Sequence, residues 1–335
     1  MRITKELLIS TAKETVKRRT FGGGGDIVCA YITGSLTFED PLIGGSTDID
    51  LIFVHALDTQ QRREIVQIAD DFHLDIAHYP QTVFSQPREL RTNAWIGGFL
   101  CHYPIVIEDN NHWFDYVRSG VFAHFFQPPN IIERVRPFTD TARKIWMDLN
   151  MQKEEDHHRV IQQYLQAIKA AANAIACLTS VPLTDRRLIP DFQRRADAVK
   201  MPGLSGGLAD LLLPADPIEP NWETWVDNWD NAYSSYLQKD NPSLSFSSCR
   251  RLYYKNAILE FSELNSQAAL WVLLRTWSHM AAELSQNSVS QRGFDDLLKL
   301  LLLDKDNFSA RLSALDQFLD VVEETIDNWR MSAGI

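Results

Sequence analysis

The hydrophobic period of this chain changes near residue 110, and that change limits the folds that the chain can adopt. Before this point, short apolar runs bounded by turn residues are typical of buried strands. These runs are residues 27–32, 49–54, 73–79 and, interrupted at Pro104, 100–107. Helical spacing predicts a helix at 3–19 and another at 59–72, the second with Ile65 and Ile68 facing inward. Strands and helices that alternate in this way predict an α/β layer.

Beyond residue 110 the pattern is helical, because Leu, Ala and aromatic residues recur at steps of three and four. The segments with this pattern are 112–124, 140–179, 222–239, 247–286 and 308–330. The predicted fold class is therefore α+β. An N-terminal domain at 1–125 is expected to hold a mixed β-sheet with flanking helices, and an all-helical C-terminal domain is expected at 126–335.

Charge and cysteine content narrow the classes of function. The 44 acidic and 33 basic residues give a net charge of −11, which disfavours a nucleic-acid partner, since nucleic-acid binding needs a basic footprint. The 4 cysteines show no CxxC pair or zinc-type cluster, so buried reduced thiols are expected. An apolar leader and a membrane-length apolar run are both missing from the sequence. A cytoplasmic protein with no membrane partner is expected.

The segment between Tyr31 and His55 carries the most specific chemistry. It leaves a strand at Gly34-Ser35, passes through a polar loop, and enters the next strand through Asp48-Ile49-Asp50. Residues two apart on a strand share a face, so the two aspartates are expected to point the same way. They lie beside the Gly34-Ser35 turn if the two strands are neighbours.

A divalent cation would relieve the repulsion between these two carboxylates. Mg²⁺ favours oxygen ligands and commonly uses one or two carboxylates together with substrate phosphates. A Gly-Ser turn offers phosphates a close backbone approach, N–H donors and a hydroxyl. Asp75 lies in the apolar run 73–79, where a charge is costly without a counter-charge. If that run pairs beside Asp48–Val54, all three acids converge.

With Gly34-Ser35, Asp48-Ile49-Asp50 and Asp75 in this order, the sequence resembles the polymerase-beta-like nucleotidyltransferase superfamily over residues 20–110. Its size and helical second half resemble the small antibiotic nucleotidyltransferases of the kanamycin and streptomycin type. A helix around Ala172 followed by Pro182–Arg187 adds to that narrower resemblance.

The superfamily resemblance implies a nucleotidyltransferase-type sheet and assigns roles to these residues. Asp48 and Asp50 would bind two Mg²⁺ ions that bridge the nucleotide phosphates, and Asp75 would complete the ligands of the second ion. Gly34 and Ser35 would hold the β- and γ-phosphates. The reaction would be attack of a hydroxyl on the α-phosphorus, with pyrophosphate leaving.

The antibiotic-modifying relatives also use a glutamate as general base, and Glu89 is the candidate counterpart in this chain. A glutamate in the first turn of a helix has a simpler explanation, since acids favour helix N-termini. Glu108 and Asp109 are weaker candidates, and Asp75 could act alone. Lys169, Arg250, Arg251 and Lys255 are candidates for gripping the triphosphate from the helical domain.

The resemblance thus predicts a Mg²⁺-dependent nucleotidyltransferase that moves a nucleoside monophosphate, with AMP from ATP expected, to a hydroxyl of a small molecule. An aminoglycoside-like antibiotic would suit the acidic chain as an acceptor. Transfer to a protein is an alternative, and so is a non-catalytic nucleotide-binding or antitoxin-like protein. A homodimer is compatible with the resemblance, and the acceptor and nucleotide base stay open.

Overall fold

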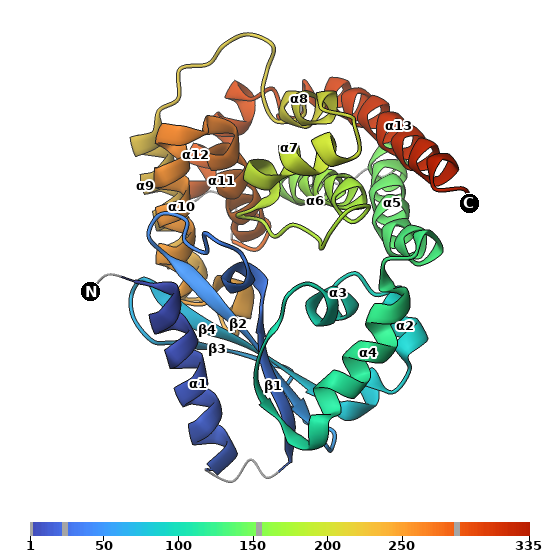
Figure 1. Cartoon of the computed structure of the whole chain (residues 1–335). Helices are drawn as coiled ribbons and strands as arrows, with labels where there is room; N and C mark the ends of the chain where they lie inside the picture. The colour runs from blue at the N-terminus through green and yellow to red at the C-terminus, as the bar shows by residue number, and fades with distance from the viewer. Residues whose placement is uncertain (1–2, 22–25, 152–155, 285–288) are drawn as a thin grey trace. The chain divides into compact units, whose positions relative to one another are not determined.

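The computed structural model describes residues 3–21, 26–151, 156–284 and 289–335 (Figure 1). The chain divides into two compact units, Met1–Ile131 and Ile132–Ile335. This division falls inside helix α5 (Pro128–Met151), shortly after the boundary predicted between 125 and 126. The first unit holds a mixed sheet with flanking helices and the second is helical over its described residues, so the α+β class is confirmed.

A five-stranded sheet in the order β3-β4-β2-β1-β5 organises the first unit. The strands are β1 (Ile27–Thr33), β2 (Thr47–His55), β3 (Arg63–Gln67), β4 (Phe72–Pro80) and β5 (Ile105–Asp109). Strands β2 and β4 run parallel to each other, and the other neighbouring pairs are antiparallel. The three central strands correspond to the apolar runs predicted at 27–32, 49–54 and 73–79.

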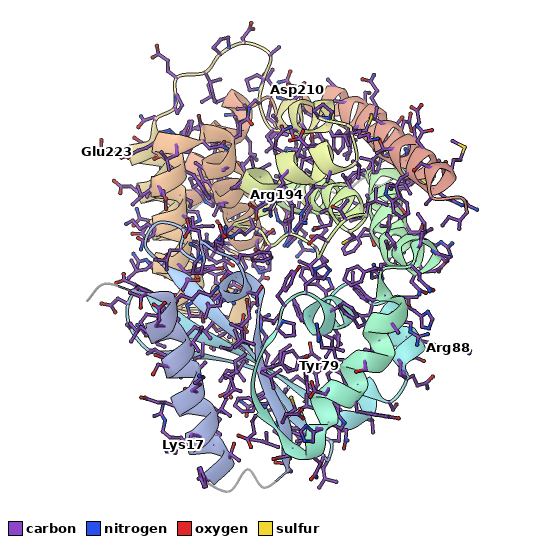
Figure 2. The ribbon with its side chains drawn as sticks, in the orientation of Figure 1. Lys17, Tyr79, Arg88, Arg194, Asp210 and Glu223 are labelled. Atoms are coloured by element: carbon purple, nitrogen blue, oxygen red, sulfur yellow. The ribbon has the colours of Figure 1, made fainter. Side chains whose placement is uncertain are left out.

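Helices cover both faces of this sheet (Figure 1). On one face, helix α1 (Lys5–Phe21) packs its apolar residues against alternate residues of the central strands, among them Leu51 and Phe53 of β2. On the other face, α2 (Pro87–Arg91), α3 (Ile96–Cys101) and α4 (Trp113–Phe125) cover Ile52 and Val54. Tyr79 of β4, labelled in Figure 2, also packs on this second face.

One local prediction in this unit is wrong, and the bounds of another are shifted. The helix predicted at 59–72 is replaced by β3, and Ile68, expected to face inward, is 38% exposed. The spacing of isoleucines imitates a helix, but the segment adds an antiparallel strand to the edge of β4 and satisfies the backbone groups there. The strand predicted at 100–107 is also shifted, because α3 ends at Cys101 and β5 begins only after Pro104.

The second unit packs its helices around two that are buried almost all round. These are α6 (His157–Ala176) and α11 (Ser266–Ala281). The others are α7 (Leu188–Ala198), α8 (Gly203–Asp210), α9 (Trp222–Tyr236), α10 (Arg250–Leu264), α12 (Val289–Leu300) and α13 (Phe308–Ser332). Short 3₁₀ turns are η4 (Leu244–Phe246) in this unit, and η1 (Gly34–Thr37), η2 (Gln81–Phe84) and η3 (Asn110–His112) in the first unit. None of the helices in the described segments is long and apolar enough to cross a membrane.

Candidate functional site

Strand pairing places three polar residues in one row across the sheet. Thr33 of β1 lies opposite Asp50 of β2, and Asp50 lies beside Asp75 of β4. The row exists because β2 has β1 on one side and β4 on the other. This neighbourhood is the condition under which the sequence predicted that the acids would converge.

The three aspartates do converge. Ligand oxygens of Asp48, Asp50 and Asp75 all lie within 4.8 Å of one another. Asp48 and Asp50 alternate with inward residues of β2, so they share the face of Ile52 and Val54. Asp75 is 6% exposed, and the other two are half-buried. The cluster is therefore set into the sheet surface while remaining accessible from one side.

The turn after β1 lies directly against this cluster. Gly34 has φ +71°, and a Cβ atom built on it would come 1.7 Å from Oδ2 of Asp50. A side chain at position 34 is thus excluded both by the backbone conformation and by the carboxylate. The backbone of the turn can approach whatever the carboxylates bind, as a phosphate-binding turn requires.

Hydrogen bonds tie the turn to the start of β2. The hydroxyls of Ser35 and Thr47 are 3.3 Å apart, and Thr47 Oγ1 donates to the carbonyl of Pro41 at 3.0 Å. Thr37 Oγ1 donates to the Gly34 carbonyl at 2.8 Å, which closes the turn on itself. Thr47 is the first residue of β2 and directly precedes Asp48, so this contact fixes the turn against the start of the strand that carries two of the acids.

Arg63 supplies the counter-charge that a buried Asp75 needs. Its Nε donates to Asp75 Oδ1 at 2.7 Å and its Nη2 donates to Oδ2 at 2.5 Å, which forms a bidentate ion pair. The Arg63 side chain is 42% exposed and that of Asp75 only 7% exposed. Arg63 was not predicted from the sequence, because the spacing at 59–72 placed it on a helix. The adjacent β-branched pair Ile65-Val66 was the signal for a strand.

Tyr79 lies four residues beyond Asp75 on β4 and therefore on the same face of the sheet. Burial raises the pKa of the Tyr79 hydroxyl, the nearby Arg63 charge opposes this rise and the Asp75 charge adds to it. The Tyr79 hydroxyl therefore stays neutral at neutral pH.

The other candidate acids lie elsewhere in the unit. Glu89 is exposed in the first turn of α2, next to Arg88 (labelled in Figure 2), and is not part of the close aspartate group. Glu108 and Asp109 pair with Ala30 and Cys29, three to four residues down β1 from Thr33. At about 3.3 Å per residue, this puts them roughly 10–13 Å along the strand from the aspartate row.

A second close acidic group contains Asp109, His112 and Asp115. Both His112 and Asp115 are exposed, and the Asp109 carboxylate accepts a hydrogen bond from the Phe114 N–H at the start of α4. Capping of a helix N-terminus explains Asp109 without any ligand.

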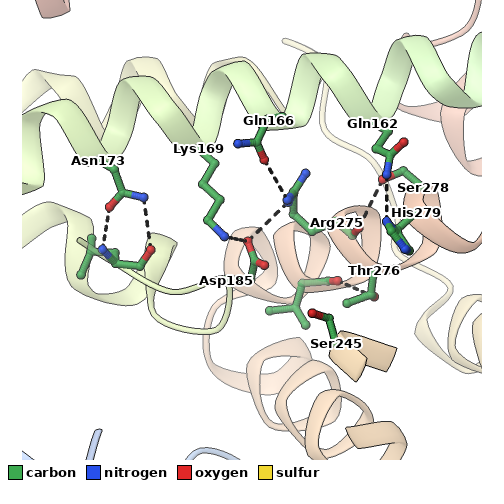
Figure 3. Close-up of polar contacts among 12 residues, drawn as sticks. Gln162, Gln166, Lys169, Asn173, Asp185, Ser245, Arg275, Thr276, Ser278 and His279 are labelled. Carbon is green, nitrogen blue, oxygen red and sulfur yellow. Dashed lines mark hydrogen bonds and ion pairs between the residues drawn. The ribbon is translucent and has the colours of Figure 1, made fainter. Parts of the chain in front are cut away.

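In the second unit, the candidate cations for triphosphate binding have acidic partners or are buried. Lys169 Nζ lies 2.8 Å from Asp185 Oδ1, and Arg275 Nε lies 3.3 Å from the same oxygen (Figure 3). These two cations hold the pKa of the Asp185 carboxyl far below its usual range, although burial alone would raise it.

The remaining cations of that group are engaged on α10. Arg251 and Lys255 both pair with Asp230 of α9, at 2.6 and 2.9 Å. Arg250 is 6% exposed and its guanidinium lies 5.7 Å from the ring centre of Tyr253. These contacts give all four cations a role in packing the helices.

A chain of hydrogen-bonded polar groups that the sequence did not predict lies on the opposite, α1-covered face of the sheet, with the two histidines at its centre buried. His55 Nδ1 is 3.0 Å from Asp26, and His55 Nε2 is 2.9 Å from His78 Nδ1. His78 Nε2 is 2.9 Å from Glu64, which also pairs with Arg19 of α1. Burial lowers the pKa of His78, and the Glu64 hydrogen bond only partly opposes that effect.

No protein-family model matches this chain, and no curated protein matches it. Among solved structures, a nucleotidyltransferase-like protein from Exiguobacterium sibiricum is similar over 94% of this chain and 91% of its own chain. The sequence identity is 9% and the TM-score is 0.34. At that TM-score the similarity supports no conclusion about this chain, so its function is inferred from its own residues.

The donor set of the aspartate cluster fits a hard divalent cation. All three side chains offer carboxylate oxygens within one small volume, which is the chemistry that Mg²⁺ and Mn²⁺ select. Three carboxylates this close repel one another, and in this structure the Arg63 guanidinium offsets one of the three charges. A divalent ion bound by these oxygens would relieve the repulsion among the three carboxylates.

Proposed function

We propose that this chain is a Mg²⁺-dependent nucleotidyltransferase that transfers a nucleoside monophosphate, AMP from ATP being the expected case, to a hydroxyl group of a small molecule. The observation that carries the proposal is the contact between the Gly34 backbone and Asp50, inside a cluster of three carboxylates. A cation site touching a side-chain-free turn suits a metal-chelated polyphosphate better than it suits a free metal ion.

Each residue then has a role that follows from its position. Asp48, Asp50 and Asp75 would hold the metal ions, and the N–H groups of Gly34 and Ser35 with the Ser35 hydroxyl would hold the β- and γ-phosphates. Bound Mg²⁺ would stabilise the charge on the entering and leaving oxygens. The rigid strand row would orient the acids, since neighbouring strands fix their spacing.

In the proposed reaction, the acceptor hydroxyl oxygen forms a bond to the α-phosphorus, and the bond to the oxygen that bridges the α- and β-phosphates breaks. Pyrophosphate leaves with that electron pair, and the hydroxyl proton passes to a carboxylate base. Asp75 belongs to the cluster and Glu89 does not, so the geometry favours Asp75 as the base. An effect of Glu89→Gln of about 10²-fold or more on the transfer rate would instead identify Glu89.

The acceptor that suits the proposal is a cationic small molecule such as an aminoglycoside, because the chain carries a net charge of −11. The experiment is to incubate the protein with labelled ATP, Mg²⁺ and a panel of aminoglycosides, lincosamides and candidate proteins, and to measure pyrophosphate release. Transfer of AMP to one of the candidate acceptor proteins would identify this chain as a protein adenylyltransferase.

A non-catalytic nucleotide-binding protein is the second candidate, and the Arg63–Asp75 ion pair is the observation that favours it. A protein that only binds nucleotide could keep Asp75 neutralised by an arginine. Titration calorimetry with ATP separates the outcomes. Mg²⁺-dependent binding without pyrophosphate release for any acceptor supports this second candidate, and equal binding in EDTA argues against a metal site in either case.

A further inference from the structure

We propose that Arg63 is a positioning residue that holds Asp75 in the nucleotide-free protein and must release it before Asp75 can bind a metal ion. This inference rests on the proposed function, because it concerns the metal site of the same cluster. It assigns to the ion pair a role beyond packing: the pair lowers the affinity of the empty cluster for divalent cations.

The geometry of the pair makes it a competitor for metal. The guanidinium donates to both oxygens of Asp75, at 2.7 and 2.5 Å, so a cation that approaches Asp75 meets a positive charge already in contact with it. Two cations that share one carboxylate repel each other, and the repulsion is strong where water is largely excluded. The Asp75 side chain is only 7% exposed, and β4 has a neighbouring strand on each side, so the carboxylate is held within the sheet rather than at its edge.

Arg63, by contrast, is placed to leave. Its side chain is 42% exposed, and β3 is the edge strand of the sheet. Arg63 lies opposite Ala77, whose small side chain lets the long arginine side chain run along the sheet surface toward Asp75. Rotation of the side chain into water would break the pair without disturbing strand pairing. A triphosphate at the Gly34 turn would offer the freed guanidinium another anion.

The Arg63–Asp75 ion pair also reduces the repulsion among the three carboxylates in the metal-free protein. Without Arg63, three carboxylates within 4.8 Å would lack this positive charge beside the most buried of them. The cost of that arrangement would fall on folding stability, because like charges this close repel one another. Arg63 thus stabilises the cluster until a metal ion replaces it.

The test uses Mn²⁺ as the probe, without nucleotide, and measures the free Mn²⁺ by electron paramagnetic resonance with the full chain. Arg63→Gln is expected to bind Mn²⁺ at least about tenfold more tightly than the wild type. Arg62→Gln is the matched control, since Arg62 is the preceding residue, is 60% exposed and pairs with Asp58. Its affinity is expected to stay within about twofold of the wild type.

The Asp75→Asn background decides whether Arg63 acts through Asp75. In that background Arg63→Gln is expected to change the Mn²⁺ affinity by less than about twofold. Arg63→Lys keeps the positive charge but cannot donate to both carboxylate oxygens in the same planar geometry. Its Mn²⁺ affinity is expected to lie between those of the wild type and Arg63→Gln. In EDTA, Arg63→Gln is expected to melt at a lower temperature than the wild type, and Mn²⁺ should raise its Tm by more.

Equal or weaker Mn²⁺ binding by Arg63→Gln, with wild-type binding intact, would overturn this inference and leave the proposed metal site standing. The inference would also be overturned if Arg63→Gln raised the Mn²⁺ affinity as much in the Asp75→Asn background as in the wild type. Arg63 would then repel the metal ion through its charge alone and not through its contact with Asp75. Absence of Mn²⁺ binding in all of these proteins, including Arg62→Gln, would overturn the metal site together with the inference.

Discussion

The Cα of Gly34 faces the carboxylate of Asp50 so closely that a Cβ atom on residue 34 would lie 1.7 Å from Oδ2. The turn after β1 and the row of Thr33, Asp50 and Asp75 across β1, β2 and β4 are therefore one structural feature. A close backbone approach to a carboxylate cluster is what a metal-chelated phosphate needs, and it is the basis of the proposed function.

Gly34→Ala is expected to weaken Mg²⁺-dependent ATP binding at least about tenfold, because the new methyl group must displace the Asp50 carboxylate. Gly45→Ala is the matched control. Gly45 also has positive φ (+66°), but a Cβ atom on it would meet nothing within 4 Å. Both variants are expected to lose about 1 kcal/mol of stability from backbone strain. Titration calorimetry with ATP checks the difference, and equal ATP affinities in the two variants would contradict the close contact.

Asp50→Asn is expected to reduce nucleotide transfer at least about 100-fold while the chain stays folded, since the change removes a metal ligand and relieves carboxylate repulsion. Pyrophosphate release measures the activity, and circular dichroism measures the fold. Asp58→Asn is the control, because the Asp58 side chain is 74% exposed and pairs only with the surface residue Arg62 among the ion pairs of the described chain. Full activity in Asp50→Asn would refute the assignment of this acid.

Asp185→Asn is expected to lower the free energy of unfolding by about 2 kcal/mol at pH 7, because Lys169 and Arg275 lose their shared anion (Figure 3). The pKa of Asp185 is far below its usual range in the folded chain, so its stabilising effect is complete above about pH 4 and declines as the pH falls. Urea titrations from pH 7 to pH 3 should show a smaller loss of stability in Asp185→Asn. The exposed Asp216→Asn is the control, and parallel pH profiles for the three proteins would contradict the prediction.

The lowered pKa of His78 predicts that the stability of the first unit also depends on pH, in a range above that of Asp185. Burial lowers its pKa in the folded chain, so below about pH 6.5 the unfolded chain binds a proton that the folded chain does not. Stability should therefore fall as the pH decreases, by up to about 1.4 kcal/mol at pH 5.5. His78→Gln should show a smaller decline between pH 7.5 and 5.5 than the exposed control His124→Gln. A decline of the same size in both variants would place the titrating group elsewhere.

The candidate site was predictable from the sequence as far as strand alternation reaches. Asp48 and Asp50 share a face because they are two apart on β2, and this holds whatever lies next to the strand. The apolar runs of β1, β2 and β4 predicted their strands because burial on both faces demands continuous hydrophobicity. Strand alternation could not decide between Glu89 and Asp75 as the base. Which of them lies beside Asp48 and Asp50 depends on how the chain folds, and the residue spacing does not show it.

What the sequence by itself determined is local: the class of the fold, the face shared by two aspartates, and the need of Asp75 for a counter-charge. The tertiary structure alone decided which residue meets that need. Arg63 lies on a segment whose isoleucine spacing favours a helix, and it became a strand only because the edge of β4 offered unpaired backbone groups. The pairing of His55 with His78 likewise depends on β2 lying beside β4. Strand neighbours are chosen by long-range hydrogen bonding and burial, which no local spacing encodes.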